Sequence, residues 1–215
     1  MRQLNKMMMA SLLLVAGCAG GGGSRDASAP TAVETQDSTK IMDTLAGKAT
    51  MRQGEKNIVP GESIGSIHLG QDAAQLSDIL GKADDGDAAM GKAWGIWNQD
   101  GGGQLSVYTS YKDSTAVAKD VKQIVVSSEH FVTEQGIRSG SSFATVKKTF
   151  PQLQLAETYI NGKETLKVYD DIERGIAFDV MNKNGEEVCV AITVHPVKTA
   201  VNNTYLTIHP GWQPK

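Results

Sequence analysis

The sequence contains only two cysteines among its 215 residues, Cys18 and Cys189. So few cysteines cannot build a disulfide scaffold, and an exported domain of this kind must rely on its hydrophobic core. Lysine and arginine form no cluster, which leaves no electrostatic footprint for nucleic acid. The apolar runs are shorter than the about 20 residues that a membrane-spanning helix needs. These absences point away from nucleic-acid binding and from a membrane-spanning protein.

Motifs for catalysis, cofactors and metals are missing as well. No serine lies in a G-x-S-x-G turn, and the triglycine at residues 101–103 is not followed by the Lys-Ser/Thr of a phosphate-binding loop. We interpret the acidic run at residues 170–173 (DDIE) as a solvated turn, because an acid–base pair would need a pocket. The histidines have no second ligand at metal-binding spacing; they are His68, His130, His195 and His209. We therefore predict a non-enzymatic protein with no catalytic residue, cofactor or metal.

Residues 1–17 are predicted to be a signal peptide. Arg2 and Lys6 precede a short apolar core, which ends in the stretch LVAGC at Cys18. This order of basic residues, apolar core, small residues and cysteine resembles a bacterial lipobox, in which the cysteine receives the lipid. We expect Cys18 to be lipidated and to anchor the protein to a membrane. No Asp follows the cysteine, so the resemblance to enterobacterial lipoproteins implies the outer membrane, with the domain facing the periplasm.

Residues 18–56 are predicted to be the lipidated cysteine and a flexible tether. The stretch is small, polar and rich in turn-forming residues, and it has no periodic apolar face. The signal peptide holds two of the 21 Lys and Arg residues and no Asp or Glu, so its removal would leave 19 basic against 24 acidic residues. About 38 flexible residues span on the order of 35 Å, which would place the folded domain clear of the lipid headgroups.

Two stretches 70 residues apart are nearly the same, residues 67–80 (IHLGQDAAQLSDIL) and residues 137–150 (IRSGSSFATVKKTF). Each has a glycine, then a polar residue suited to cap a helix, then apolar residues at helical spacing. Asp72 is the expected cap of the first helix, and Gly81 is expected to end it. Ser141 or Ser142 is the expected cap of the second. Both helices are too short to be stable alone, so they must pack on something.

Strand-like residues follow each helix. Alternating apolar residues recur in both halves, and the two Asn-Gly pairs at residues 161–162 and 184–185 indicate hairpins. We predict an α+β fold of two tandem repeats, each with a short helix and an antiparallel meander, with the helices packed on one face of the sheet. The expected boundaries are residues 57–128 for the first repeat, 129–198 for the second and 199–215 for a C-terminal tail.

These repeated stretches resemble the signature of small exported proteins of the SmpA/OmlA/BamE type. Residues 80–84 (LGKAD) match the family's Leu-Gly-Lys-Pro-Asp except at Ala83. The same helix-and-meander unit occurs in tandem in secreted β-lactamase inhibitor proteins. The resemblance covers about 140 residues and implies a protein that binds other proteins; it brings no catalytic residue, because the matching positions are turn glycines and core residues.

Aromatic residues are the candidate contact residues for a partner. Trp94 and Trp97 are three residues apart in a predicted strand and should face opposite sides of the sheet. One should pack under the helix, while the other lies on the open face with Tyr108 or Tyr111, or packs in a second core layer. We expect a lipid-anchored envelope protein that binds another protein in envelope assembly or maintenance. The alternatives are an inhibitor or immunity protein that blocks a periplasmic hydrolase, and a carrier of a small ligand.

Overall fold

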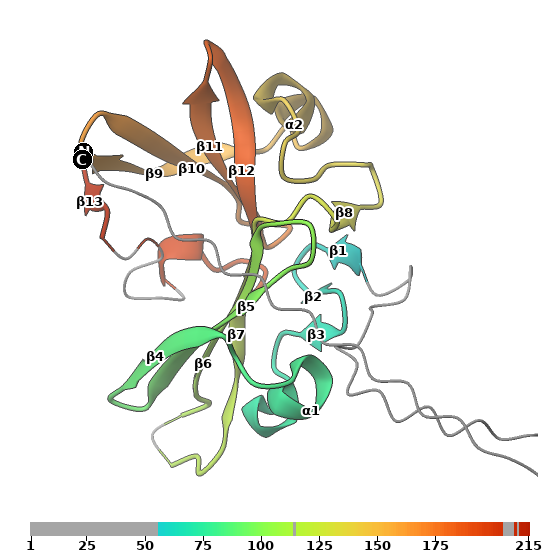
Figure 1. The fold of residues 1–215 in the computed structure, drawn as a ribbon, viewed down its shortest axis with the longest axis vertical. Coiled ribbons are helices and arrows are strands. Elements are labelled where there is room, and N and C mark those ends of the chain that lie inside the picture. The colour runs from blue at the N-terminus through green and yellow to red at the C-terminus, as the bar shows by residue number, and fades with distance from the viewer. Residues whose placement is uncertain (1–55, 114, 204–208, 210) are drawn as a thin grey trace, which may run out of the picture. The chain divides into compact units, whose positions relative to one another are not determined.

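The computed structural model describes residues 56–113, 115–203, 209 and 211–215 (Figure 1). The predicted signal peptide, Cys18 and all but the last residue of the predicted tether lie outside these residues. Strands account for 49% of the well-placed region and helices for 12%. The prediction of an α+β fold with helices packed on the sheet is therefore wrong, because the domain consists mostly of β-structure in two sheets.

The larger sheet has nine antiparallel strands in the order β13-β9-β10-β11-β12-β7-β6-β5-β4. Its strands are β4 (Asp85–Ala89), β5 (Lys92–Asn98), β6 (Gln104–Tyr111), β7 (Lys119–Val126), β9 (Gln154–Asn161), β10 (Glu164–Asp171), β11 (Ile176–Lys183), β12 (Glu186–Val194) and β13 (Gln213–Pro214). Each half of the chain supplies one four-stranded meander. The last strands of the two meanders, β7 and β12, pair in the middle of the sheet, with residues 124–126 opposite residues 192–194.

The smaller sheet lies against one face of the larger one and has the order β3-β2-β1-β8 (Figure 1). Its strands are β1 (Asn57–Val59), β2 (Ser63–Ile64), β3 (Ile67–His68) and β8 (Val132–Thr133). Gly61 and Gly65, both with positive φ, form the tight turns between β1, β2 and β3. Strands of two or three residues show no alternation, and the sequence therefore gave no sign of this sheet.

The two helices form where they were predicted, but they are short. They are α1 (Leu76–Leu80), which continues the 3-10 turn η2 (Ala73–Gln75), and α2 (Phe143–Thr149). Asp72 accepts a hydrogen bond from the Ala74 N–H, and Ser142 accepts one from the Thr145 N–H, so both act as N-caps. Gly81, with φ of 75°, ends α1. Helices of five and seven residues cover too little of a nine-stranded sheet to form a layer, which is why the predicted fold class failed.

The repeated glycine joins each helix to the meander of its own half. The Gly70 N–H donates to the Val121 carbonyl in β7, and the Gly140 N–H donates to the Cys189 carbonyl in β12, both at 2.8 Å. The strand residue in each case donates its own N–H back to the residue after the glycine. Both glycines have positive φ, a conformation that other residues adopt only with strain.

The hairpin at residues 184–185 forms as the sequence predicted. Asn184 and Gly185 have φ of 56° and 90° and connect Lys183 in β11 to Glu186 in β12, as a type I′ turn requires. The hairpin at residues 161–162 is also present, but Asn161 is the last residue of β9 rather than a turn residue, and Gly162 begins the turn.

The main hydrophobic core fills the space between the two sheets and the helices. Its largest fully buried side chains include Phe131, Phe150, Phe178 and Ile64. A smaller cluster lies on the opposite face of the second meander and contains Tyr159, Leu166, Val168, Ala177 and Val201. Val201 and Trp212, which packs against this cluster, belong to the predicted C-terminal tail, so part of that tail covers the sheet.

Candidate functional site: an apolar groove beside the first helix

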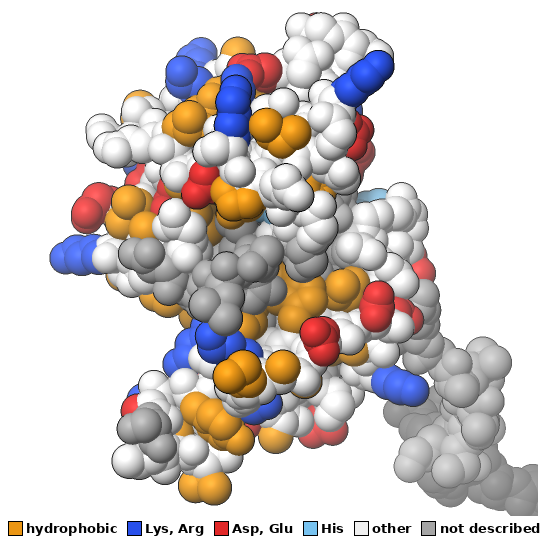
Figure 2. Space-filling view, turned by 90° about the vertical axis from the view of Figure 1, so that its left-hand side faces the viewer, with side chains coloured by type: hydrophobic (Ala, Val, Ile, Leu, Met, Phe, Trp, Pro, Cys, Tyr) orange, Lys and Arg blue, Asp and Glu red, His pale blue; other side chains and the backbone are white. Residues whose placement is uncertain are grey.

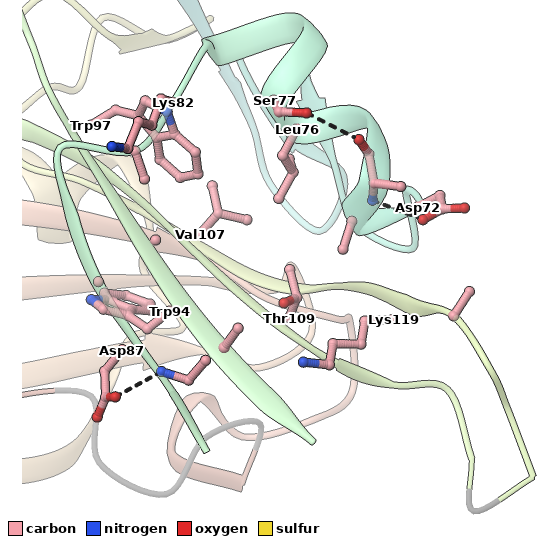
Figure 3. A pocket seen from close by; sticks show the side chains of 18 of the residues that line it. Asp72, Leu76, Ser77, Lys82, Asp87, Trp94, Trp97, Val107, Thr109 and Lys119 are labelled. Carbon is pink, nitrogen blue, oxygen red and sulfur yellow. Dashed lines mark hydrogen bonds between the residues drawn. The ribbon is translucent and has the colours of Figure 1, made fainter. Parts of the chain in front are cut away.

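An open groove of about 1010 Å³ lies between η2 and α1 on one side and strands β4, β5 and β6 on the other (Figure 3). Its lining is mostly apolar and small; it includes Ala73, Ala74, Leu76, Ala88, Ala93, Gly95, Trp97, Val107, Thr109, Val117 and Ala118. Leu76 and Val107 face the groove from the helix and from the sheet (Figure 3). The groove is therefore a hollow in the face of the sheet that α1 only partly covers.

Trp97 closes one end of the groove. Its indole N–H donates to the carbonyl of Gly81 at 3.1 Å, which ties β5 to the end of α1, and only 8% of the residue is exposed. The indole lies across Gly95, where an added Cβ would come within 2.7 Å of the ring. Trp97 can therefore take this position only because residue 95 is a glycine. The sequence predicted one tryptophan under the helix but did not show this dependence on Gly95.

The two meanders correspond strand by strand. Each has a register shift between its third and fourth strands, after Tyr108 in β6 and after Asp179 in β11. When these shifts are matched, Gly95 in β5 takes the place of Tyr169 in β10.

The groove exists because one aromatic ring of the second half, that of Phe143, has no counterpart in the first. In the second half the rings of Phe143 and Tyr169 lie 4.3 Å apart, measured between centroids, and fill the space between α2 and the sheet. The corresponding residues of the first half are Ala73 and Gly95. The Trp97 indole lies over Gly95, so the space left open in the first half is the one that the Phe143 ring fills in the second.

Exposed apolar side chains flank the groove. Val117 on its rim is 97% exposed, and Met90, in the turn between β4 and β5, is 98% exposed. Tyr111 is 45% exposed, with the Lys119 ammonium 5.5 Å from its ring centroid. In Figure 2 hydrophobic side chains lie exposed at the lower end of the molecule, where Figure 1 places β4. Exposed apolar side chains beside a groove are typical of interaction sites.

The outer wall of the groove is the edge strand β4, all five residues of which are exposed. The Asp85 carboxylate accepts a hydrogen bond from the Gly86 N–H, and the Asp87 carboxylate accepts one from the Ala88 N–H, both at 2.7 Å. Gly86 and Ala88 lie in the pairs whose N–H groups point away from β5. The aspartates therefore cover the edge N–H groups that an added strand would need.

The predicted contact aromatics are not one cluster. Trp94 lies directly opposite Tyr108 across β5 and β6, on the face of the sheet away from Trp97, and also borders the groove where it meets β4. Tyr108 is only 5% exposed, and burial raises the pKa of its hydroxyl above the usual value. Tyr108 and Trp97 therefore do not offer exposed rings to a partner, whereas Trp94 is half-buried.

The acidic run at residues 170–173 is only partly the solvated turn that we predicted, because Ile172 and Glu173 are exposed and the two aspartates are buried. Asp170 and Asp171 are 2% and 1% exposed. Asp170 lies between the ring of His195, with Oδ1 and Nε2 2.9 Å apart, and the N–H of Val201, which donates to Oδ2 at 2.9 Å. The error arose because the partners of Asp170 are 25 and 31 residues away, beyond the reach of a local pattern.

His195 and Cys189 are both buried. His195 has its second ring nitrogen 3.1 Å from the carbonyl of Pro196, and burial raises the pKa of the Cys189 thiol well above its usual range, which keeps the thiol protonated. Within the described ranges, no three His, Cys, Asp or Glu side chains gather closely enough to hold a metal ion. No helix among the described residues is long and apolar enough to span a membrane.

Comparison with family models, with curated proteins and with solved structures found no match for this chain. The resemblance to the SmpA/OmlA/BamE type therefore stays a prediction from the repeated stretches alone.

Proposed function

We propose that the chain is a non-enzymatic, lipid-anchored protein of the cell envelope that binds another protein through the groove beside α1. The observation that carries this proposal is a groove of about 1010 Å³ with apolar walls and an exposed apolar rim. Burial of such surface against a partner is favourable by roughly 25 cal/mol for each Å² removed from water. The groove is open along one side, which suits side chains that enter from another protein.

A photo-crosslinker tests this proposal in intact cells. A benzophenone amino acid at Val117, on the rim of the groove, is expected to form one adduct with a single protein, identified by mass spectrometry. Ala73→Phe should fill the groove with the residue that stands at the matching position of the second half. We expect the adduct to fall by at least about tenfold in that background, because an anchor residue of an interface typically contributes more than 1.4 kcal/mol.

Two controls make the result specific to the groove. The crosslinker at exposed Leu155 in β9 should give no such adduct. Ala144→Phe, in the first turn of α2, places the same ring on an exposed site of the second half and should leave the Val117 adduct intact. An adduct that survives Ala73→Phe, or no adduct at all, contradicts the proposal. An envelope assembly component as the partner would favour the assembly role, and a hydrolase would favour an inhibitor.

Lipid anchoring has a separate test. Cys18→Ser is expected to move the protein from the membrane fraction to the soluble periplasm, because no acyl chain could then be attached. Fractionation followed by immunoblotting measures the shift, and metabolic labelling with an alkyne fatty acid should mark the parent chain only. Cys189→Ser serves as the matched control and should remain labelled and membrane-bound. Retention of the Cys18→Ser protein in the membrane fraction would refute the anchor.

A further inference from the structure

We propose that the groove receives an aromatic side chain of the partner protein, with a basic side chain next to it. The inference rests on the proposed function and adds the chemistry of the residues that the groove selects. It follows from the comparison of the two halves of the chain and from the charges at the rim of the groove.

The second half of the chain shows the contents that suit this space. There the ring of Phe143 packs on Tyr169, and the Lys147 ammonium lies 5.6 Å from the Phe143 ring centroid. A cation over an aromatic face is a favourable pair. In the first half the residues that match Phe143 and Lys147 are Ala73 and Ser77. Both the ring and the cation are thus missing where the groove opens.

The walls of the groove fit a ring. Leu76 and Val107 lie on facing walls, and the Trp97 indole stands at one end (Figure 3). The walls are the apolar side chains of α1 and β6, which belong to the main core and hold the hollow in shape without an occupant. A ring that enters would contact aliphatic walls on both faces and reach the edge of the indole, an arrangement that aromatic pairs favour.

The charges at the rim favour a basic neighbour for this ring. Asp72, at the start of η2, lines the groove and forms no ion pair in the described part of the chain. Asp85 and Asp87 pair with Ile96 and Trp94, so their side chains lie on the face of the sheet away from Trp97. Of the two lysines in the lining, Lys119 lies over the Tyr111 ring, and Lys82 lies beside Trp97 at the opposite end from Asp87 (Figure 3). The α1 side of the groove, where Ser77 stands in place of the lysine of the second half, is therefore the part complementary to a partner lysine or arginine.

The hydrogen bonds of β4 indicate that the partner presents side chains and does not add a strand. The outward N–H groups of Gly86 and Ala88 are bonded to the adjacent carboxylates. An added strand would have to displace both of these bonds. A side chain that enters the groove leaves them in place.

Short peptides test the inference directly. The full-length protein, in detergent, is labelled with 5-fluorotryptophan, and its three tryptophan signals are assigned by single Trp→Phe variants. We use the acetylated, amidated tripeptides Gly-Phe-Lys, Gly-Ala-Lys and Gly-Phe-Glu as probes. Gly-Phe-Lys is expected to shift the ¹⁹F signal of Trp97 and to leave that of Trp212 unchanged. Gly-Ala-Lys should bind at least about tenfold more weakly, because it loses the buried ring.

Variants locate the two parts of the recognition. Ala73→Phe and, from the sheet side, Ala93→Leu should each abolish the Trp97 shift, while Ala144→Phe should not. Asp72→Asn, which keeps a side chain able to cap the helix, should weaken Gly-Phe-Lys by up to about fivefold and leave Gly-Phe-Glu no weaker than before, as expected for an exposed ion pair. Circular dichroism shows whether each variant is folded. Two groove-filling variants are used so that the test still holds if one of them does not fold.

The inference fails if Gly-Phe-Lys causes no Trp97 shift, if Gly-Ala-Lys is equally effective, or if the shift survives in both groove-filled variants. Equal binding of Gly-Phe-Lys and Gly-Phe-Glu would overturn the basic neighbour. These failures differ from failure of the proposed function. If the peptides do not bind but the cellular adduct at Val117 is intact, the protein-binding function stands and the aromatic recognition is wrong. If the peptides bind but no adduct forms, the proposed function is wrong and the groove still binds an aromatic side chain.

Discussion

Replacement of Asp170 by alanine is expected to lower the free energy of unfolding by about 2–5 kcal/mol, because it leaves two buried groups without their hydrogen-bond partner at about 1–3 kcal/mol each. Both ring nitrogens of His195 face acceptors, the Asp170 carboxylate and the Pro196 carbonyl, and the imidazole is fully buried. Without the carboxylate, that ring and the Val201 N–H would lose their partner in the protein interior.

Urea denaturation followed by circular dichroism measures this loss. Asp87→Ala provides the control, because this aspartate is exposed and bonds only to its neighbour's backbone; it should change stability by less than about 0.5 kcal/mol. Trp212 fluorescence should report earlier loss of the C-terminal segment in the Asp170→Ala protein, since Val201 is tied to that carboxylate. A loss for Asp170→Ala that is no greater than for the control would contradict the buried pair.

Gly175→Ala is expected to destabilise the protein by about 2–5 kcal/mol. Gly175 has φ of 68°, where a side chain costs about 1–2 kcal/mol, and overpacking adds about 1–3 kcal/mol. An added Cβ would lie 2.3 Å from the His195 carbonyl oxygen and 2.8 Å from the Gly61 Cα. Both atoms belong to the backbone and cannot rotate away. The strands of the large sheet and the turn of the small one would have to separate here.

Gly136→Ala is the matched control for this prediction. Gly136 also has positive φ, at 84°, but no heavy atom lies within 4 Å of the position of an added Cβ. It should lose only the about 1–2 kcal/mol of the backbone conformation. The difference between the two variants in thermal or urea unfolding isolates the steric contribution of the close approach between Gly175 and Gly61. Equal losses would show that the backbone yields at this point.

The sequence predicted well the features that depend on neighbouring residues. The cap at Asp72, the end of α1 at Gly81 and the turn at residues 184–185 all follow from local chemistry, and the structure contains each of them. The small sheet was missed because its strands are too short for periodicity. The fold class failed because helix length decides whether helices form a layer, and both helices stop after one to two turns.

The groove itself could be predicted only in part. Alignment of the two repeated stretches places Ala73 against Phe143, a small residue where a large one stands, and this signal was present in the sequence. The second half of the contrast, Gly95 against Tyr169, is hidden, because the meanders differ in the lengths of their turns and the spacing is no longer 70 residues. The burial of Asp170 likewise depends on contacts that only the folded sheet brings together.

The pairing of β7 with β12 also affects how the chain reaches its fold. The strands meet through residues 124–126 and 192–194, so the joint between the halves cannot close until almost the whole domain is available. The small sheet has the same requirement, since β1 pairs with β8 about 75 residues later. Contacts of such long sequence separation make folding slow, and a protein exported as an extended chain would have to complete it outside the cytoplasm.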